Sequence, residues 1–319
     1  MLKKPFVIAE IGNNHEGSFQ IARKLVQKAS ECGVDAVKFQ TYDVTKFIHK
    51  KETKSYNRLK KFQLSYEEFY KLSLIAKNKN LKFISTPLDL VSASKIKDFV
   101  DYFKIASGDN NFNELISVVL KQNKKTIIST GLLNENEVYK LVEYVKSKKF
   151  NLKKFSLLHC VSDYPANHKD LNLYFIKKLK KKYPKIKIGY SDHSIGLEAI
   201  ITAFFFGAEV IEKHFTLDNN FSNFRDHSLS LNPKDMKYYV QFLKKSILSF
   251  GSSSKILSHG ELKNFNKMRR SYYFLKSKKK GDKVEADDLI YLRPKLKIKK
   301  TRSQNTTLVK NYLKGDLFK

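Results

Sequence analysis

Short apolar runs alternate with helical stretches along the first ~250 residues, and this alternation limits the folds that are open to the chain. Helical spacing separates most of the runs, as at Ile21, Leu25 and Ala29. Eight β–α repeats in about 250 residues are typical of a TIM (β/α)8 barrel, whereas an open doubly wound sheet would carry fewer strands and a switch point. We therefore predict an α/β fold of the TIM-barrel type. The eight predicted strands are 6–9, 36–39, 82–85, 102–105, 126–129, 155–158, 186–189 and 210–212.

The character of the sequence changes after a last predicted helix at 233–250. Gly251 and three serines are typical of a linker, and short alternating segments follow at 271–275, 288–292 and 307–309. We predict a barrel domain over 1–250, a linker over 251–267 and a small β-rich domain over 268–319. A domain of about 50 residues is close to the lower limit for a self-sufficient core, so we expect it to dock on another surface.

Composition argues against several classes of protein. The net charge of +31 suggests a nucleic-acid partner, but only seven of the 62 basic residues are arginine and the lysines are spread along the chain. We interpret the charge as a lysine-rich surface and predict no nucleic-acid partner. No apolar run approaches the ~20 residues that cross a membrane. Two lone cysteines, Cys32 and Cys160, form no disulfide framework and favour a cytoplasmic protein.

Polar side chains stand at or just past the carboxyl end of every predicted strand. In a parallel barrel these ends meet at one mouth, where ligands bind. Lys38 and Lys104, ringed by hydroxyl groups, predict an anion pocket that suits a phosphate and a carboxylate. The polar residues at strand ends are Glu10, Lys38, Gln40, Ser85, Thr86, Lys104, Ser107, Ser129, Thr130, His159, Ser162, Ser191, His193, Glu212 and His214.

Two histidines, His193 and His214, each follow a predicted strand. Two imidazoles with open coordination positions suit Mn²⁺ or another divalent ion that acts as a Lewis acid. Taken singly, a lysine can extend from the core to solvent, a histidine can be structural, and a serine can cap a helix. Their coincidence at every strand end is what favours an active site.

Other histidines and one insertion complete the predictions for the mouth. His15 follows the first strand, and we expect it to face the mouth. His49, His168 and His259 are expected to face solvent. Residues 41–64 form a polar, lysine-rich insertion that we expect to loop over the mouth.

Eight motifs resemble the sialic acid synthases in order and spacing. They are FVIAEIGNNHEGS from Phe6, VKFQT from Val37, ISTP from Ile84, KIASG from Lys104, STG from Ser129, LLHC from Leu157, GYSDH from Gly189 and EKHFT from Glu212. The tail resembles the antifreeze-like (SAF) domain of that family. The resemblance implies a transferase that condenses phosphoenolpyruvate with an N-acetylhexosamine, N-acetylmannosamine in the sialic acid case. The products are a nine-carbon keto acid and phosphate.

The resemblance also implies residue roles. His193 and His214 match the ligands of a divalent metal, Mn²⁺ first, with Mg²⁺ or Co²⁺ as alternatives. Glu10, Lys38 and Lys104 match catalytic positions, and both lysines also match the phosphoenolpyruvate pocket. Arg293 matches an arginine that the tail delivers into the active site of a partner subunit, which requires a domain-swapped homodimer. The remaining substrate-binding positions are Gln40, Thr86, Ser107, Asp109, Ser129, Ser162, Tyr164, Ser191 and Asp226.

The chain departs from the family pattern at four places. Asp109 stands where Glu is common, Leu88 where Phe is common, Phe224-Arg225 where Gly-Pro is common, and Lys295 where Gly is common. All but the last are expected near the acceptor sugar. The acceptor is therefore open between N-acetylmannosamine and a 2,4-diacetamido sugar, which would give legionaminic or pseudaminic acid. Two further alternatives are a phosphoenolpyruvate-dependent synthase of shorter keto acids, for which more arginines would be expected at the mouth, and a polyanion-binding protein.

Overall fold

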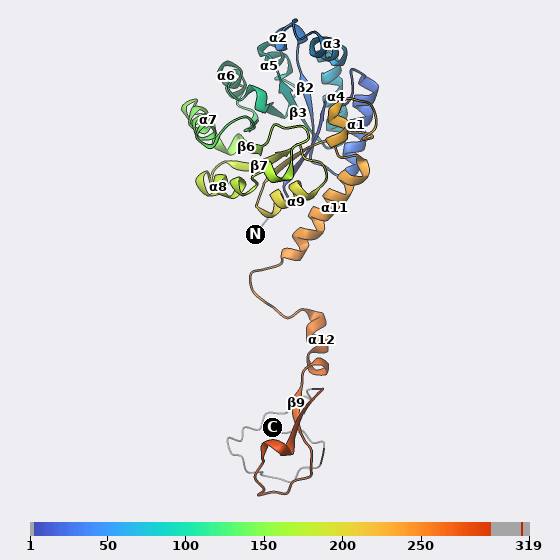
Figure 1. The fold of residues 1–319 in the computed structure, drawn as a ribbon, viewed down its shortest axis with the longest axis vertical. Coiled ribbons are helices and arrows are strands. Elements are labelled where there is room, and N and C mark those ends of the chain that lie inside the picture. The colour runs from blue at the N-terminus through green and yellow to red at the C-terminus, as the bar shows by residue number, and fades with distance from the viewer. Residues whose placement is uncertain (1–2, 295–313, 315–319) are drawn as a thin grey trace. The chain divides into compact units, whose positions relative to one another are not determined.

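The computed structural model describes residues 3–294 and 314. The chain divides into two compact units, Met1–Gly251 and Ser252–Lys319. In the first unit, eight parallel strands close into a barrel in sequential order, and helices surround them (Figure 1). This confirms the predicted TIM barrel. The strands are β1 (Phe6–Gly12), β2 (Ala36–Thr41), β3 (Lys82–Pro87), β4 (Tyr102–Ile105), β5 (Lys125–Ser129), β6 (Phe155–Cys160), β7 (Lys187–Asp192) and β8 (Val210–His214).

The helices follow from local sequence signals. Helix α4 begins with a capping box in which Ser65 and Glu68 exchange hydrogen bonds, and α7 begins in the same way with Asn134 and Glu137. Helix α11 has a proline at its start, which fits the first turn because proline has no N–H to leave unpaired. The helices of the first unit are α1 (Phe19–Cys32), α2 (Val44–Phe47), α3 (Thr53–Phe62), α4 (Tyr66–Asn78), α5 (Leu90–Ile96), α6 (Asn113–Lys121), α7 (Glu135–Ser147), α8 (Tyr174–Lys182), α9 (Glu198–Phe205), α10 (Arg225–Leu229) and α11 (Pro233–Phe250).

Side chains fill the barrel interior in layers. Because side chains alternate across a strand, every second residue points inward. The lower layer is apolar and comprises Ile8, Ala36, Ile84, Ile127, Leu158 and Val210. Two residues further along the strands the interior becomes polar, with Glu10, Lys38, Thr86, Ser129 and Glu212. The apolar layer thus closes the barrel from below, and the polar layer forms the floor of the mouth.

Most strands continue past their predicted ends. Strand β1 reaches Gly12 and β8 reaches His214, so several polar residues expected after a strand lie within it. Parallel pairing satisfies the backbone of these residues, and most of their side chains face the interior, whereas that of His159 faces outward. The polar ends of most strands were predicted too short, because polar residues weaken an apolar pattern; only β4 and β5 end where they were predicted to end.

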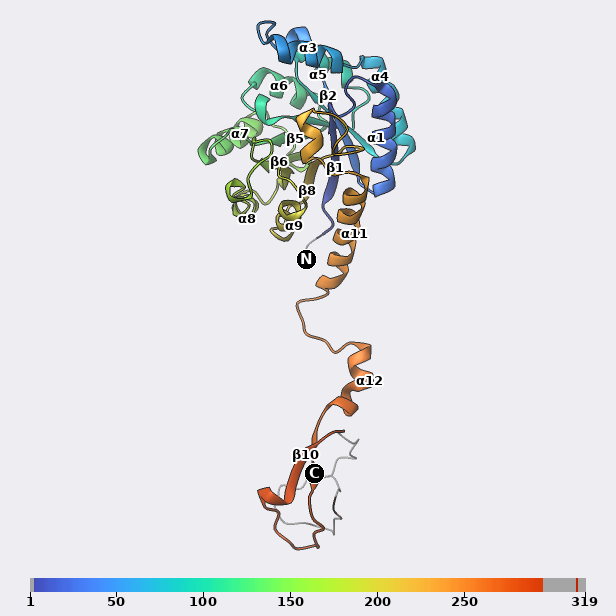
Figure 2. The same cartoon turned by 45° about the vertical axis from the view of Figure 1, so that its right-hand side comes forward.

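The insertion at 41–64 is helical rather than an open loop. Helix α2 begins after Asp43, whose carboxylate accepts a hydrogen bond from the backbone N–H of Thr45, and α3 follows. Both views place α3 beyond the carboxyl end of β2 (Figure 1 and Figure 2). Tyr42, Val44 and Leu88 form a small apolar cluster there, against which Phe47, Ile48 and Leu59 pack.

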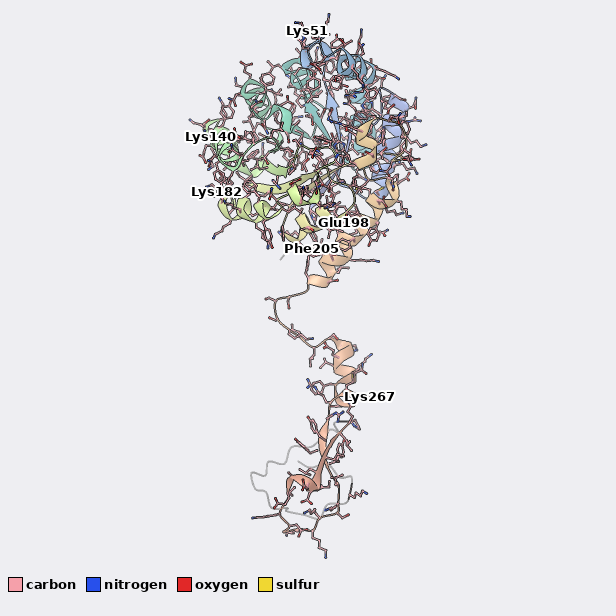
Figure 3. All side chains as sticks on the ribbon, in the orientation of Figure 1. Lys51, Lys140, Lys182, Glu198, Phe205 and Lys267 are labelled. Carbon is pink, nitrogen blue, oxygen red and sulfur yellow. The ribbon has the colours of Figure 1, made fainter. Side chains whose placement is uncertain are left out.

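Lysines cover the outer surface of the first unit. Lys51, Lys140 and Lys182 are exposed and point away from the barrel (Figure 3). None of the helices in the described part of the chain has the length and apolarity that crossing a bilayer requires.

The second unit contains a helix and a hairpin-like strand pair. Helix α12 (His259–Met268) occupies the second half of the segment predicted as a linker, ends at the first residue of the predicted small domain, and begins with a capping box of Ser258 and Glu261. Strands β9 (Ser271–Phe274) and β10 (Leu289–Leu292) pair antiparallel, at two of the three predicted positions. The third predicted strand, 307–309, and Lys295 lie outside the described residues. The proposed SAF identity of this unit stays a prediction.

Candidate active site

Four charged side chains meet inside the carboxyl half of the barrel, and we call them the lumen cluster: Glu10, Lys38, Lys104 and Glu212. All four are buried. Lys38 Nζ lies 2.8 Å from Glu10 Oε2 and 3.8 Å from Glu212 Oε2. Lys104 Nζ lies 3.2 Å from Glu212 Oε1, which also accepts a 2.9 Å hydrogen bond from Ser191. Closure of the barrel brings these residues from β1, β2, β4 and β8 into one network.

The two carboxylates of the lumen cluster have opposite electrostatic environments. Burial raises the pKa of Glu10, and the adjacent Lys38 offsets only part of that effect. Burial also opposes ionisation of Glu212, but Lys104 and Lys38 outweigh it, so the pKa of Glu212 is lowered. Glu212 therefore keeps the negative charge, and Glu10 is the carboxyl that can hold a proton. A pair of carboxyls with separated pKa values is the usual arrangement for acid–base chemistry.

Several polar atoms near the mouth are buried without a hydrogen-bonding partner among the described residues. They are Glu10 Oε2, Ser129 Oγ, Ser162 Oγ, Glu212 Oε2 and His214 Nδ1, of which the two carboxylate oxygens lie in the ion pairs with Lys38. Buried polar groups in proteins are normally paired. Hydroxyl and imidazole groups that are left unpaired beside two ammonium groups are available to a polar, anionic ligand.

The lumen cluster forms the floor of a cavity of about 430 Å³. Most of the predicted site residues line this cavity, which places them around one space. Those that line it are Glu10, Lys38, Gln40, Lys104, Ser107, Asp109, Ser129, Tyr164, Ser191, His193, His214 and Asp226.

Three predicted site residues are placed differently. Thr86 is not in the lining but accepts a 3.2 Å hydrogen bond from Lys38 Nζ. Ser162 lies beside Gly131, where any side chain would clash with the hydroxyls of Ser162 and Ser107, so the glycine lets these two serines approach each other. Arg293 is exposed in the second unit, and its predicted role stays a prediction.

The predicted position at the mouth is wrong for two histidines, His15 and His159. His15 does not line the cavity; it is buried against Phe39, whose ring packs in the core between barrel and helices. His159 hydrogen-bonds the carbonyl of Leu171 and packs against Phe175 on the same outer side. His15 follows β1 and His159 is the next-to-last residue of β6, but both side chains lie on the outer side of the barrel. His49, His168 and His259 are exposed as predicted.

Two of the three remaining histidines, His193 and His214, fit a divalent metal ion; the third, His227, hydrogen-bonds Thr216 and Glu16. The rings of His193 and His214 lie 5.5 Å apart between centroids. His193 Nδ1 lies 2.8 Å from the carbonyl oxygen of Val161, which can only accept, so Nδ1 carries a proton and Nε2 is the ring nitrogen that can face a metal ion. Burial lowers the pKa of His193, but Cys160 and the Val161 carbonyl outweigh burial, so this pKa is raised. Burial and then the charge of His193 keep the pKa of His214 well below its usual range, so the His214 ring is neutral.

A third protein ligand does not join them. The described residues contain no group of three or more His, Cys, Asp or Glu side chains that could hold a metal ion. Two imidazoles with open coordination positions suit an ion that also binds substrate or water. The residues present therefore fit the predicted metal.

The insertion supplies one wall of the cavity. Phe47, Ile48, Ser55, Arg58 and Leu59 line it from α2, α3 and the segment between them. The Arg58 guanidinium lies 5.6 Å from the centre of the Phe224 ring. Sequence reasoning missed Ser55 and Arg58; the signal was an arginine in an insertion, in a chain with only seven arginines.

Three of the four departures from the family pattern line the same cavity. They are Leu88, Asp109 and Phe224-Arg225, and Asp226, which matches the family, lines it beside them. Arg225 lies 4.5 Å from the centre of the Tyr164 ring and 3.3 Å from Asp226 Oδ1. Burial raises the pKa of Asp109 to about 6.

Comparison with known proteins identifies the family. Residues 25–255 match the family model described as the NeuB family, which is more than half of the chain. The chain belongs to the NeuB family. This membership confirms the resemblance to the sialic acid synthases that the motifs indicated.

Individual proteins are similar to most of the chain. An uncharacterized protein of Methanocaldococcus jannaschii is 40% identical over 290 residues, which covers 91% of this chain and 85% of that protein. The N,N'-diacetyllegionaminic acid synthase of Campylobacter jejuni is 34% identical over 335 residues and covers 100% of both chains. The crystal structure of the N-acetylneuraminic acid synthetase of Leptospira borgpetersenii, solved with citrate, has a TM-score of 0.74 at 32% identity. It covers 82% of this chain and 90% of that one.

Proposed function

We propose that the chain is a nonulosonic acid synthase, which joins phosphoenolpyruvate, an N-acetylated hexosamine and water to give a nine-carbon keto acid and phosphate. The observation that carries this proposal is the meeting of Lys38, Lys104 and the unpaired hydroxyl of Ser129 with His193 and His214 in one cavity. NeuB relatives with named activities are legionaminic, pseudaminic or sialic acid synthases, which supports the same reaction class.

Phosphoenolpyruvate is proposed to bind at the floor of the cavity. Lys38 and Lys104 provide positive charge, and Ser107, Ser129 and Ser191 provide hydroxyl groups, with Ser162 nearby. Glu212 holds the two ammonium groups in place by ion pairs. Charge-assisted hydrogen bonds of this kind are the strong ones for phosphate and carboxylate groups.

The acceptor sugar is proposed to bind in its open-chain form above the enolpyruvate. A divalent ion, Mn²⁺ first with Mg²⁺ or Co²⁺ as alternatives, held by His193 and His214 would polarise its aldehyde. C3 of phosphoenolpyruvate forms the new bond to the aldehyde carbon, water adds at C2, and the C2–O bond to phosphate breaks. Glu10 is proposed to give a proton to the new alkoxide and to take one from the attacking water.

The acceptor is proposed to be a 2,4-diacetamido sugar in preference to N-acetylmannosamine. Phe47, Ile48, Leu59, Leu88 and Phe224 make one wall of the cavity largely apolar. A sugar with two acetamido methyl groups gains more from such a wall than a sugar with one, at about 0.8 kcal/mol for each buried CH₂-sized group. The full-length similarity to a legionaminic acid synthase supports this choice.

The test is product identification by mass spectrometry, with phosphate release measured in parallel. Phosphoenolpyruvate is offered with N-acetylmannosamine, with 2,4-diacetamido sugars, and with a phosphorylated pentose or tetrose. We expect a nine-carbon keto acid from the N-acetylated acceptors and loss of activity in EDTA. Product only from the phosphorylated pentose or tetrose would instead establish a synthase of shorter keto acids, and full activity in EDTA would remove the metal role.

The tail is proposed to complete the active site of a partner subunit in a domain-swapped homodimer. Arg293 is the residue expected to reach the partner's cavity. We expect Arg293→Ala and Glu10→Gln to be inactive separately and to regain activity when the two proteins are mixed, because one site of the mixed dimer would be intact. Failure of the mixture to regain activity, with dimers shown to exchange, would contradict the swapped arrangement.

A further inference from the structure

A second buried ion pair lies directly behind the two histidines. Asp192 ends β7 and Lys213 is the next-to-last residue of β8, and they are register partners. Lys213 Nζ lies 2.6 Å from Asp192 Oδ2, and the two side chains are 1% and 0% exposed. Because side chains alternate, His193 and His214 face the cavity while Asp192 and Lys213 face the surrounding helices.

The ion pair holds the backbone on both sides of His193 by hydrogen bonds. Asp192 Oδ1 accepts hydrogen bonds from the backbone N–H of Ser194 at 2.9 Å and from the Ser194 hydroxyl at 2.8 Å. Lys213 Nζ also donates to the carbonyl of Ser194. The residues before and after His193 are thus held by one ammonium group. Tyr190 adds a 3.0 Å hydrogen bond from its hydroxyl to Asp192 Oδ1.

These hydrogen bonds around His193 lie where the pairing of β7 with β8 stops. The register of β7 with β8 ends at Asp192 and Lys213, so His193 stands one residue beyond the last register pair. His214 immediately follows Lys213. The ion pair therefore links the two histidine-bearing segments where the regular ladder no longer does.

We infer that Asp192 and Lys213 are positioning residues that set the separation and facing of the His193 and His214 rings. The inference rests on the proposed metal site, and it assigns a function to a pair that touches neither substrate nor metal. A buried ion pair contributes little net stability compared with an apolar pair of similar volume. Its specific geometry, which fixes both neighbours of His193, is what an apolar pair cannot reproduce.

The test replaces the ion pair by an apolar pair, Asp192→Leu with Lys213→Met, in the full-length protein. We expect this double variant to remain folded, as judged by circular dichroism and thermal melting. We expect its Kd for Mn²⁺, measured on metal-free protein by the electron paramagnetic resonance of free Mn²⁺, to rise at least about tenfold. The matched control is Lys187→Met at the opposite, exposed end of β7, which should leave the Kd unchanged.

The measured Kd values for Mn²⁺ decide whether Asp192 and Lys213 act as positioning residues. A double variant that binds Mn²⁺ within twofold of the wild-type Kd overturns the positioning role and leaves the metal site intact. A wild-type protein that binds no Mn²⁺ overturns the metal site and the positioning role together. If the double variant does not fold, Ser194→Ala and Tyr190→Phe, which each remove one hydrogen bond to Asp192, take its place. An unchanged Kd in both would overturn the inference.

Discussion

Two buried charge clusters stand a few residues apart in this barrel and differ in how completely they are paired. The outer cluster, Asp192 and Lys213 with Tyr190 and Ser194, uses both carboxylate oxygens in hydrogen bonds. The lumen cluster leaves Glu212 Oε2 without a hydrogen bond from the described residues and lines the cavity. Charges that are fully paired hold the backbone, and charges that are partly paired remain able to bind a ligand.

The largest effect is expected from Lys104→Met in the lumen cluster. Because Lys104 is proposed to bind phosphoenolpyruvate, kcat/KM should fall by about a thousandfold. Glu212 keeps Lys38 and Ser191 as partners, so the melting temperature should change by less than about 4 °C. The control is Lys125→Met, an exposed lysine at the start of β5. Retained activity in Lys104→Met would place phosphoenolpyruvate elsewhere.

Substitution in the outer cluster, in contrast, is expected to lower the stability of the protein. Asp192→Asn leaves Lys213 charged and buried without its counter-ion, which should lower the free energy of unfolding by about 3 kcal/mol. Urea denaturation measures this, with the exposed Asp98→Asn as control. A loss below about 1 kcal/mol would mean that the two clusters are energetically alike and that the comparison fails.

A smaller effect, dependent on pH, is expected at Asp109 in the cavity wall. Its pKa is raised to about 6 by burial, whereas an Asp in an unfolded chain titrates near ~3.9. The folded protein holds this proton more tightly, so stability present below pH ~4 is lost as the pH rises to about 6. Asp109→Asn removes that loss, and we expect it to be more stable than wild type by about 1–2 kcal/mol at pH 7.5. Urea titrations at pH 4 and 7.5 decide, since a stability difference independent of pH would exclude this cause.

The smallest effect is expected at the rim. Arg58→Met removes the guanidinium from the Phe224 ring, a contact of about 0.5–1 kcal/mol at an exposed site. Since both residues line the acceptor side, KM for the sugar should rise about threefold with kcat unchanged. Steady-state kinetics with each substrate varied separately provide the measurement. A rise in KM for phosphoenolpyruvate instead would contradict the placement of the acceptor, and Arg23→Met on α1 is the matched control.

Much of this architecture could be predicted because the barrel repeats a simple pattern. Apolar runs marked all eight strands, and polar letters at their ends marked most of the residues that line the cavity. His15 and His159 show the limit of that reasoning, since a residue beside a strand end can face either way. The helices of the insertion were missed because they are short and lysine-rich, so the few apolar residues of their packed face, such as Tyr56 and Leu59, did not stand out in the sequence.

The sequence by itself determined the barrel, the family and the identity of the side chains that point inward. Which charges meet was decided only by tertiary structure. Lys104 and Glu212 are separated by 108 residues, and closure of the barrel brings them to hydrogen-bonding distance. Glu212 forms ion pairs with two ammonium groups and Glu10 with one, so burial prevails at Glu10 and charge prevails at Glu212. The different protonation of two identical side chains thus depends on their neighbours in space.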